Sequence, residues 1–166
     1  MAKPNKREGE ISGAEFGEDR KYRYVLWRIW DIEKPTIMFI GLNPSKAGEF
    51  ENDRTITRVC GMAKGWGYGG IYMMNCFPYI STDPEDLKEF GNTSYNDKCL
   101  REVMEIVSDV IFAWGKFPIV KERCRDVEIA AMYPGGKALI HNKDGSPRHP
   151  LYVPKKTTPV PYKNTP

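Results

Sequence analysis

Short apolar runs, each stopped by turn residues, recur along the chain. They are rich in β-branched and aromatic side chains and cover residues 36–40, 71–77, 109–113 and 137–141. A continuous run of this length that ends in Gly, Pro or Asn predicts a strand buried on both of its faces. Strands of that kind belong to a sheet whose two faces are covered by helices.

Between these runs, apolar residues recur at the spacing of helix turns. We expect a first helix between Asp53, its predicted N-cap, and the glycines that begin at Gly65. Further helices are expected at residues 81–90, 97–107 and 118–132. Alternation of strands and helices predicts a three-layer α/β/α domain with a largely parallel central sheet.

The segment at residues 21–30 is aromatic and β-branched and predicts one more strand. Because only a short turn separates it from residues 36–40, we expect these two strands to pair antiparallel. We expect residues 1–19 to be a flexible N-terminal segment, residues 20–154 a single α/β domain, and residues 155–166 a loose C-terminal tail.

The amino-acid composition limits the classes of function that the protein can have. The net charge of +3 is compatible with nucleic acid but does not require it. No apolar run approaches the roughly 20 residues of a membrane span, and the polar N-terminus does not resemble a secretory signal. The 4 cysteines contain no Cys-x-x-Cys pair, so we expect reduced thiols, no metal or other cofactor, and a cytoplasmic location.

Distinctive polar residues follow the predicted strands. Asn43 and Asn75 end the first two, Gly115 ends the third, and His149 lies in the loop after the last. The carboxyl ends of parallel strands share one edge of a sheet, where ligands of α/β proteins bind. An Asn side chain presents one acceptor and a double donor in fixed geometry, which suits the hydrogen-bonding edge of a nucleobase. The sequence therefore predicts a binding site at this edge.

Several of these segments resemble motifs of the uracil-DNA glycosylase superfamily. Residues 41–45 (GLNPS) resemble its first motif, in the variant with Asn in place of Asp. Residues 72–78 resemble the strand that ends in the base-reading Asn, and residues 110–115 resemble a later apolar strand ending in Gly. Residues 149–151 (HPL) resemble the catalytic His-Pro-Ser motif, although Leu151 replaces its Ser.

A closer resemblance covers residues 20–154. The LNPS, WGYGG and RHPLY segments together resemble a family of bacterial and phage proteins of unknown function. It is the domain-of-unknown-function family numbered sixteen forty-three. This second resemblance implies a fold and carries no activity.

The superfamily resemblance implies roles for individual residues. Asn43 would orient an attacking water through its side-chain oxygen, and Asn75 would pair with the edge of a flipped base. His149 would stabilise negative charge on the departing base, and Phe50 would stack on that base. An amide positions water but is a poor general base, so activity through Asn43 should be modest.

The remaining candidates line or flank the same loops. We assign Gly41 and Pro44 to base binding, and Ser45 and Arg148 to phosphate binding. These assignments predict a protein that recognises a nucleobase or nucleotide, with DNA or a free nucleotide as its partner. In its enzymatic form it is a DNA glycosylase-like hydrolase of an N-glycosidic bond.

Structural roles explain the same residues equally simply. A loop histidine with a backbone partner accounts for His149, and a strand-end amide that satisfies buried backbone accounts for Asn75. Core packing accounts for Phe50 and Trp114. The alternative function is accordingly a non-catalytic nucleic-acid-binding or interaction protein, and a different reaction on a nucleotide is a third option.

Overall fold

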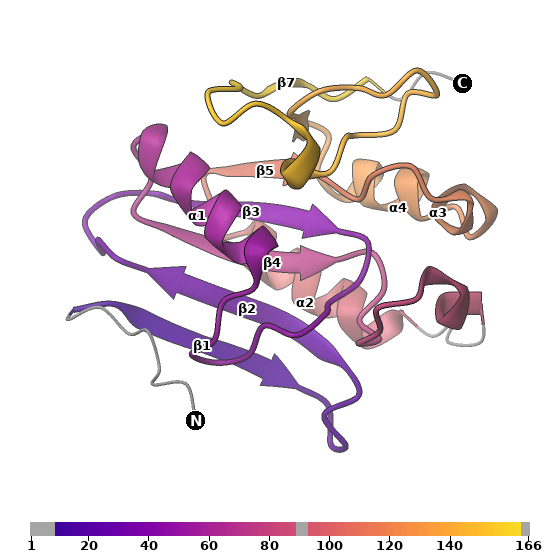
Figure 1. The fold of residues 1–166 in the computed structure, drawn as a ribbon, viewed down its shortest axis with the longest axis horizontal. Coiled ribbons are helices and arrows are strands. Elements are labelled where there is room, and N and C mark those ends of the chain that lie inside the picture. Colours follow the sequence, from indigo (N-terminus) through magenta and orange to yellow (C-terminus); the bar gives the residue numbers. More distant parts are fainter. Residues whose placement is uncertain (1–8, 89–92, 164–166) are drawn as a thin grey trace.

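The computed structural model describes residues 9–88 and 93–163, which fold around one mixed seven-stranded sheet (Figure 1). The strand order is β1-β2-β4-β3-β5-β6-β7. Strands β4, β3, β5 and β6 run parallel, and the other strands pair antiparallel. The strands are β1 (Ile11–Phe16), β2 (Arg23–Ile29), β3 (Thr36–Gly41), β4 (Gly70–Asn75), β5 (Asp109–Phe112), β6 (Lys137–Ala138) and β7 (Val160–Pro161).

Helices cover both faces of this sheet. They are α1 (Arg54–Gly65), α2 (Ser94–Met104), α3 (Pro118–Glu122) and α4 (Arg125–Met132), with 3-10 turns η1 (Pro84–Lys88) and η2 (Pro150–Tyr152). Alternate residues of β3 enter two separate apolar clusters. Ile37 and Phe39 pack with α1, whereas Met38 and Ile40 pack with α2, α3 and α4. Figure 1 shows α1 crossing in front of the sheet and α2 behind it.

The four apolar runs form the neighbouring parallel strands β3 to β6, because both of their faces are buried. The prediction of a largely parallel sheet holds for these strands only, since β1, β2 and β7 extend the sheet antiparallel at its two sides. Strand β6 is also shorter than predicted and ends at Ala138.

The predicted antiparallel pairing of residues 21–30 with residues 36–40 is wrong. Strand β2 pairs with β4 instead, with Trp27 opposite Tyr72. Both sides of β3 are occupied by parallel neighbours, β4 and β5, so no side of β3 is left for β2. The chain crosses from β2 to β3 through a turn in which Trp30 and Asp31 donate backbone hydrogen bonds to Gly69 O.

Strands form in the described parts of both segments that the sequence predicts to be flexible or loose. Strand β1 lies within the segment expected to be flexible, and the Trp27 ring occupies the space beside Gly13 where a side chain would stand. At the other end, β7 pairs with β6 and Tyr162 packs edge-on against Phe112, with ring centroids 4.9 Å apart. Residues 1–8 and 164–166 lie outside the described residues.

Three predicted helices differ in detail from the structure. The helix expected at 118–132 is split into α3 and α4, because Cys124 between them adopts a left-handed conformation with φ of 56°. The segment at 81–90 forms only the 3-10 turn η1, and residues 89–92 are not described. The helix expected at 97–107 begins and ends earlier, at Ser94 and Met104. Because position 124 is a cysteine and not Gly or Pro, the local sequence gives no signal for the break between α3 and α4.

Replacing a glycine by alanine should have opposite effects on stability at Gly61, on α1, and at Gly69, just before β4. Gly61 lies in the exposed interior of α1, where a Cβ would meet nothing within 4 Å. We expect Gly61→Ala to raise the free energy of unfolding by about 0.5–1 kcal/mol, because Ala has the higher helix propensity. Urea unfolding measures this change. Gly69→Ala should destabilise instead, since its Cβ would lie 2.0 Å from Asp31 O. A less stable Gly61→Ala protein would contradict this description of α1.

Candidate functional site

A pocket of about 300 Å³ opens at the carboxyl ends of β3 and β4. Its other walls come from β2, the start of α1, residues 81–84 and Phe117. Six of the eight predicted site residues line it: Gly41, Asn43, Pro44, Ser45, Asn75 and His149. Its volume lies at the lower end of the roughly 300–1,000 Å³ found for small-ligand pockets.

Gly41 leaves room for the Asn75 side chain. The two residues are opposite each other in the parallel pairing of β3 and β4. A Cβ at Gly41 would lie 2.9 Å from Asn75 Oδ1 and 2.9 Å from Met73 Cε. The glycine that ends β3 therefore permits the close approach of the neighbouring strand-end amide.

The Asn75 amide is buried and lacks a donor partner. Asn75 is 2% exposed, and its Nδ2 makes no hydrogen bond to any described residue. Its backbone carbonyl accepts from Asn96 Nδ2 at 2.8 Å, so the strand end itself is held. Leaving a buried donor unpaired costs about 1–3 kcal/mol. A native group that carries this cost inside a pocket is a good candidate for ligand contact.

The Asn43 amide is held by the loop opposite. Its Nδ2 donates to Tyr79 O at 3.1 Å and to Ser81 O at 2.9 Å. These bonds tie the loop after β3 to the loop after β4 and fix the orientation of the side chain. The side-chain oxygen is thereby left as the acceptor that Asn43 offers to a ligand or water.

His149 presents one defined nitrogen as a donor. It precedes η2, and its Nδ1 accepts a hydrogen bond from Leu151 N at 3.1 Å. Burial lowers the pKa of His149 below its usual 6.5, with Asp53 opposing weakly. The neutral ring therefore carries its proton on Nε2. A neutral donor of this kind can stabilise an oxyanion without first being protonated.

This assignment predicts how His149 behaves with pH. Nitrogen-proton correlation NMR should show the proton on Nε2 at pH 7 and a titration below 6.5. Because the unfolded state binds the proton more tightly, the contribution of His149 to stability is present above 6.5 and is lost as pH falls through the folded-state pKa. His149→Gln should remove this part of the pH dependence. A His149 that titrates above 6.5 would contradict the assignment.

Ser45 and Asp53 link the pocket to α1. Asp53 is the N-cap predicted from the sequence, and its Oδ1 accepts from Ile56 N at 2.8 Å. Ser45 Oγ donates to the other carboxylate oxygen at 2.9 Å. Both oxygens of the one acidic side chain in the pocket lining are thus already engaged.

The structure does not bring Phe50 and Arg148 into this pocket. Phe50 is 46% exposed on the loop before α1, and Arg148 Nε donates to Asn142 Oδ1 at 2.9 Å. The aromatic residue on the pocket wall is instead Phe117, and the cation is Arg23. Sequence analysis missed both. Arg23 lies on β2, whose place beside β4 the sequence did not predict, and Phe117 lies in the loop after β5, where the sequence singled out only Trp114 and Gly115.

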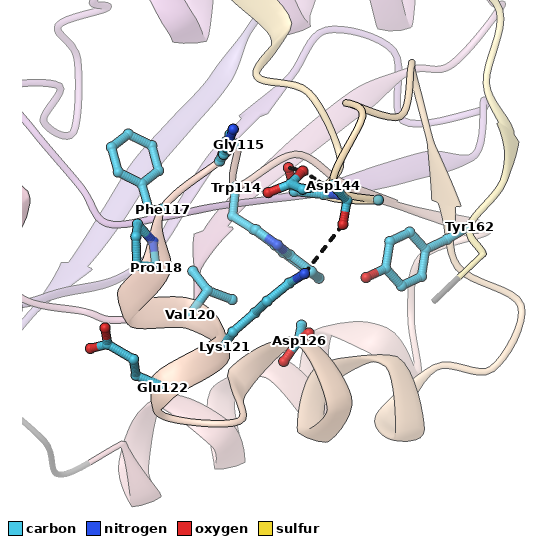
Figure 2. A pocket seen from close by; sticks show the side chains of 13 residues that line it. Trp114, Gly115, Phe117, Pro118, Val120, Lys121, Glu122, Asp126, Asp144 and Tyr162 are labelled. Carbon is cyan, nitrogen blue, oxygen red and sulfur yellow. Dashed lines mark hydrogen bonds between the residues drawn. The ribbon is translucent and has the colours of Figure 1, made fainter. Parts of the chain in front are cut away.

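A second pocket of about 310 Å³ lies beyond Phe117, between α3 and the loop after β6 (Figure 2). Its walls include Trp114 and Tyr162, whose ring centroids are 5.9 Å apart, and Lys121 Nζ donates to Asp144 O across it. Trp114 is 2% exposed, as its core-packing interpretation expects. None of the polar strand-end residues Asn43, Asn75 and His149 lines this pocket.

A broader groove of about 580 Å³ runs beside α1 and shares Asp53 with the strand-end pocket. Its lining contains three basic residues, Arg54, Arg58 and Lys155. Arg58 donates to Val153 O at 3.2 Å, whereas Arg54 and Lys155 are exposed. The groove therefore offers positive charge next to the pocket.

Fold and site together define an α/β protein with a polar pocket at the carboxyl ends of parallel strands, where this class binds ligands. The chain belongs to the family described as "Protein of unknown function (DUF1643)", whose model matches residues 23–151. The matched region includes Asn43, Asn75 and His149. Comparison with curated proteins and with solved structures returned no match.

Two searches of the described residues bear on ligands and membranes. No helix there is long and apolar enough to cross a membrane. No group of three or more His, Cys, Asp or Glu side chains in the same residues is arranged to hold a metal ion. None of the four cysteines forms a disulfide, and Cys124 is the exposed one among them.

Proposed function

We propose that this protein binds a nucleobase or nucleotide in the strand-end pocket and hydrolyses its N-glycosidic bond. The buried, unpartnered amide of Asn75 is the observation that carries this proposal. An amide that faces a pocket with a free donor and an adjacent acceptor complements the edge of a base. His149 and Asn43 line the same pocket, so a base and its sugar would meet all three side chains.

The chemistry assigns one task to each residue. The bond between C1′ and the base nitrogen breaks, and the base leaves with the electron pair. The Nε2 proton of His149 stabilises the resulting negative charge by a hydrogen bond. A water positioned by the Asn43 side-chain oxygen adds to C1′ and loses its proton to solvent, and the departed base takes a proton from solvent.

We also propose that the fold is the three-layer arrangement of the uracil-DNA glycosylase superfamily and that the protein acts in the cytoplasm. The order of the four motifs along the chain and the helices on both sheet faces support the first part. The lack of disulfides among the four cysteines supports the second.

The second candidate is a non-catalytic nucleic-acid-binding protein that retains this pocket. The hydrogen bonds of Asn43 Nδ2 to Tyr79 O and Ser81 O favour it, because they give that residue a complete structural role. An amide is also a poor general base.

Incubation with DNA oligonucleotides that carry uracil or other modified bases separates the two candidates. The hydrolase predicts free base and abasic sites in at least one of these substrates. Binding without base release from any substrate would leave the second candidate. Parallel reactions with the matching free nucleotides distinguish a DNA substrate from a mononucleotide.

If DNA is the partner, its phosphates should lie along the basic groove. Arg54→Gln combined with Lys155→Gln should weaken binding at low salt and reduce the salt dependence of the binding constant by roughly 0.9 per lost phosphate contact. Fluorescence anisotropy at several salt concentrations measures both. Lys98→Gln combined with Arg101→Gln, on α2 at the other sheet face, removes the same charge as a control. An equal loss in both variants would reject the groove as the DNA track.

A further inference from the structure

Three arginines among the described residues are buried, and they differ in how their charge is satisfied. Arg28 donates to four backbone carbonyls and to Asn52 Oδ1. Arg125 forms ion pairs with Asp97 and Glu128. Arg23 is 3% exposed, yet its side chain donates only one hydrogen bond to the described residues, from Nη1 to Ala47 O at 2.9 Å. Arg23 is therefore the exception among them.

Arg23 lines the strand-end pocket with a guanidinium that the described residues satisfy only in part. Its Nε is buried without a partner in the described residues, and Arg23 lines the pocket together with Asn75 and His149. Its guanidinium forms no ion pair with any described carboxylate. Burial lowers the pKa of Arg23 to about 10, with Asp53 opposing and Arg28 adding to the effect. An uncompensated buried cation is costly, and a bound anion offsets that cost.

Two further donors in the pocket are not used by the protein. Asn75 offers its unpaired Nδ2 and His149 its Nε2 proton. The carboxylate of Asp53 is already held by Ser45 and by Ile56 N. A ligand that satisfies these donors and Arg23 carries several acceptor atoms, and a negatively charged oxygen suits the arginine best.

We propose that Arg23 anchors an oxyanion subsite within the strand-end pocket, which receives a phosphate or carboxylate oxygen of the ligand. The fork of Nε and Nη2 donates to this oxyanion, as arginine forks do to carboxylates and phosphates. The subsite deepens the proposed function, because it adds an anionic group to the ligand whose base Asn75 reads. The oxyanion subsite depends on Arg23 alone, so it can be tested without knowing which base the protein binds.

The binding of inorganic phosphate, measured by thermal unfolding, tests this proposal. Thermal unfolding at constant ionic strength, with phosphate replacing chloride, should show a Tm of the wild type that rises with phosphate concentration. Arg23→Gln keeps a donor for Ala47 O and removes the charge. It should weaken the apparent affinity for phosphate about 10- to 100-fold, the loss expected for one charge-assisted hydrogen bond. Arg101→Gln, on α2 at the other sheet face, should keep the wild-type response. Loss of the response in Arg101→Gln as well, or no response in the wild type, would overturn the subsite.

A second measurement holds even if Arg23→Gln fails to fold. The NMR signal of the Arg23 Nε–H group, assigned by through-bond experiments on isotopically labelled wild-type protein, should move on titration with phosphate. The signals of Arg28 and Arg125, whose guanidinium groups are satisfied within the protein, should stay in place and serve as internal controls. An Arg23 signal that does not move overturns the proposal.

The source of the oxyanion follows from two further comparisons of affinity. Tighter binding of uridine 5′-monophosphate than of uridine, abolished in Arg23→Gln, identifies a free nucleotide. Tighter binding of a dinucleotide than of its nucleosides, equally dependent on Arg23, identifies the backbone of a nucleic acid. Base release in the oligonucleotide assay is read separately, so the subsite and the proposed hydrolase can fail independently.

Discussion

His149→Ala is expected to lower the rate of base release by about 100- to 1,000-fold, the usual cost of removing one oxyanion donor. The effect should fall on kcat far more than on affinity, because the base becomes negatively charged only in the transition state. Single-turnover measurement of abasic-site formation reads this rate without interference from product release. Burial of His149 keeps the ring neutral, with a lowered pKa, so the loss should persist across pH 7–8.

Two companion variants separate the roles in the pocket. Asn43→Ala should also lower kcat more than affinity, whereas Asn75→Asp should weaken binding, because a carboxylate repels the acceptor edge that the amide donor pairs with. His141→Ala is the matched control, since His141 Nε2 accepts from Lys163 N, and neither residue lines the pocket. Equal activity of His149→Ala and His141→Ala would remove His149 from the mechanism.

Arg125→Met is expected to cost about 3–5 kcal/mol of stability, the range found when one partner of a buried ion pair is removed. Arg125 is 2% exposed and bonds Asp97 Oδ1 at 2.6 Å and Glu128 Oε2 at 2.5 Å. Its Nε also donates to Cys76 O at 3.1 Å, directly after Asn75. The substitution leaves the Asp97 carboxylate, only 17% exposed, without its cation.

Urea unfolding of the wild type, Arg125→Met and Lys98→Met measures this loss of stability. Lys98→Met is the control, because Lys98 and Glu102 form an exposed ion pair, which contributes about 0–1 kcal/mol. If Arg125→Met proves as stable as Lys98→Met, then the buried pair does not hold the end of β4.

The central strands could be predicted, because a strand that is buried on both faces needs apolar residues at successive positions and so forms a continuous apolar run in the sequence. The edge strands could not. Strand β1 has a single buried position, Gly13, among exposed and partly buried ones, so its composition resembles a flexible segment. The placement of β2 beside β4 depends on β3 having parallel neighbours on both sides, which is a long-range property that no local turn encodes.

The candidate site divides in the same way. Asn43, Asn75 and His149 could be placed together, because they follow strands whose carboxyl ends share one edge. Arg23 could not, since it reaches the pocket from β2, which pairs antiparallel with β4. Phe50 and Arg148 lie in loops whose paths are set by tertiary contacts, and the structure leaves both outside the pocket.

The proposed function requires that the Asn75 amide pairs with a nucleobase. NMR tests this directly, by following the side-chain NH₂ signal of Asn75 during titration with nucleosides, nucleotides and oligonucleotides of each base. We expect at least one base to shift this signal while the amide signal of Asn142, which is held by Ser146 Oγ at 3.0 Å, does not move. An Asn75 signal unchanged by every base, alone or within DNA, would contradict it.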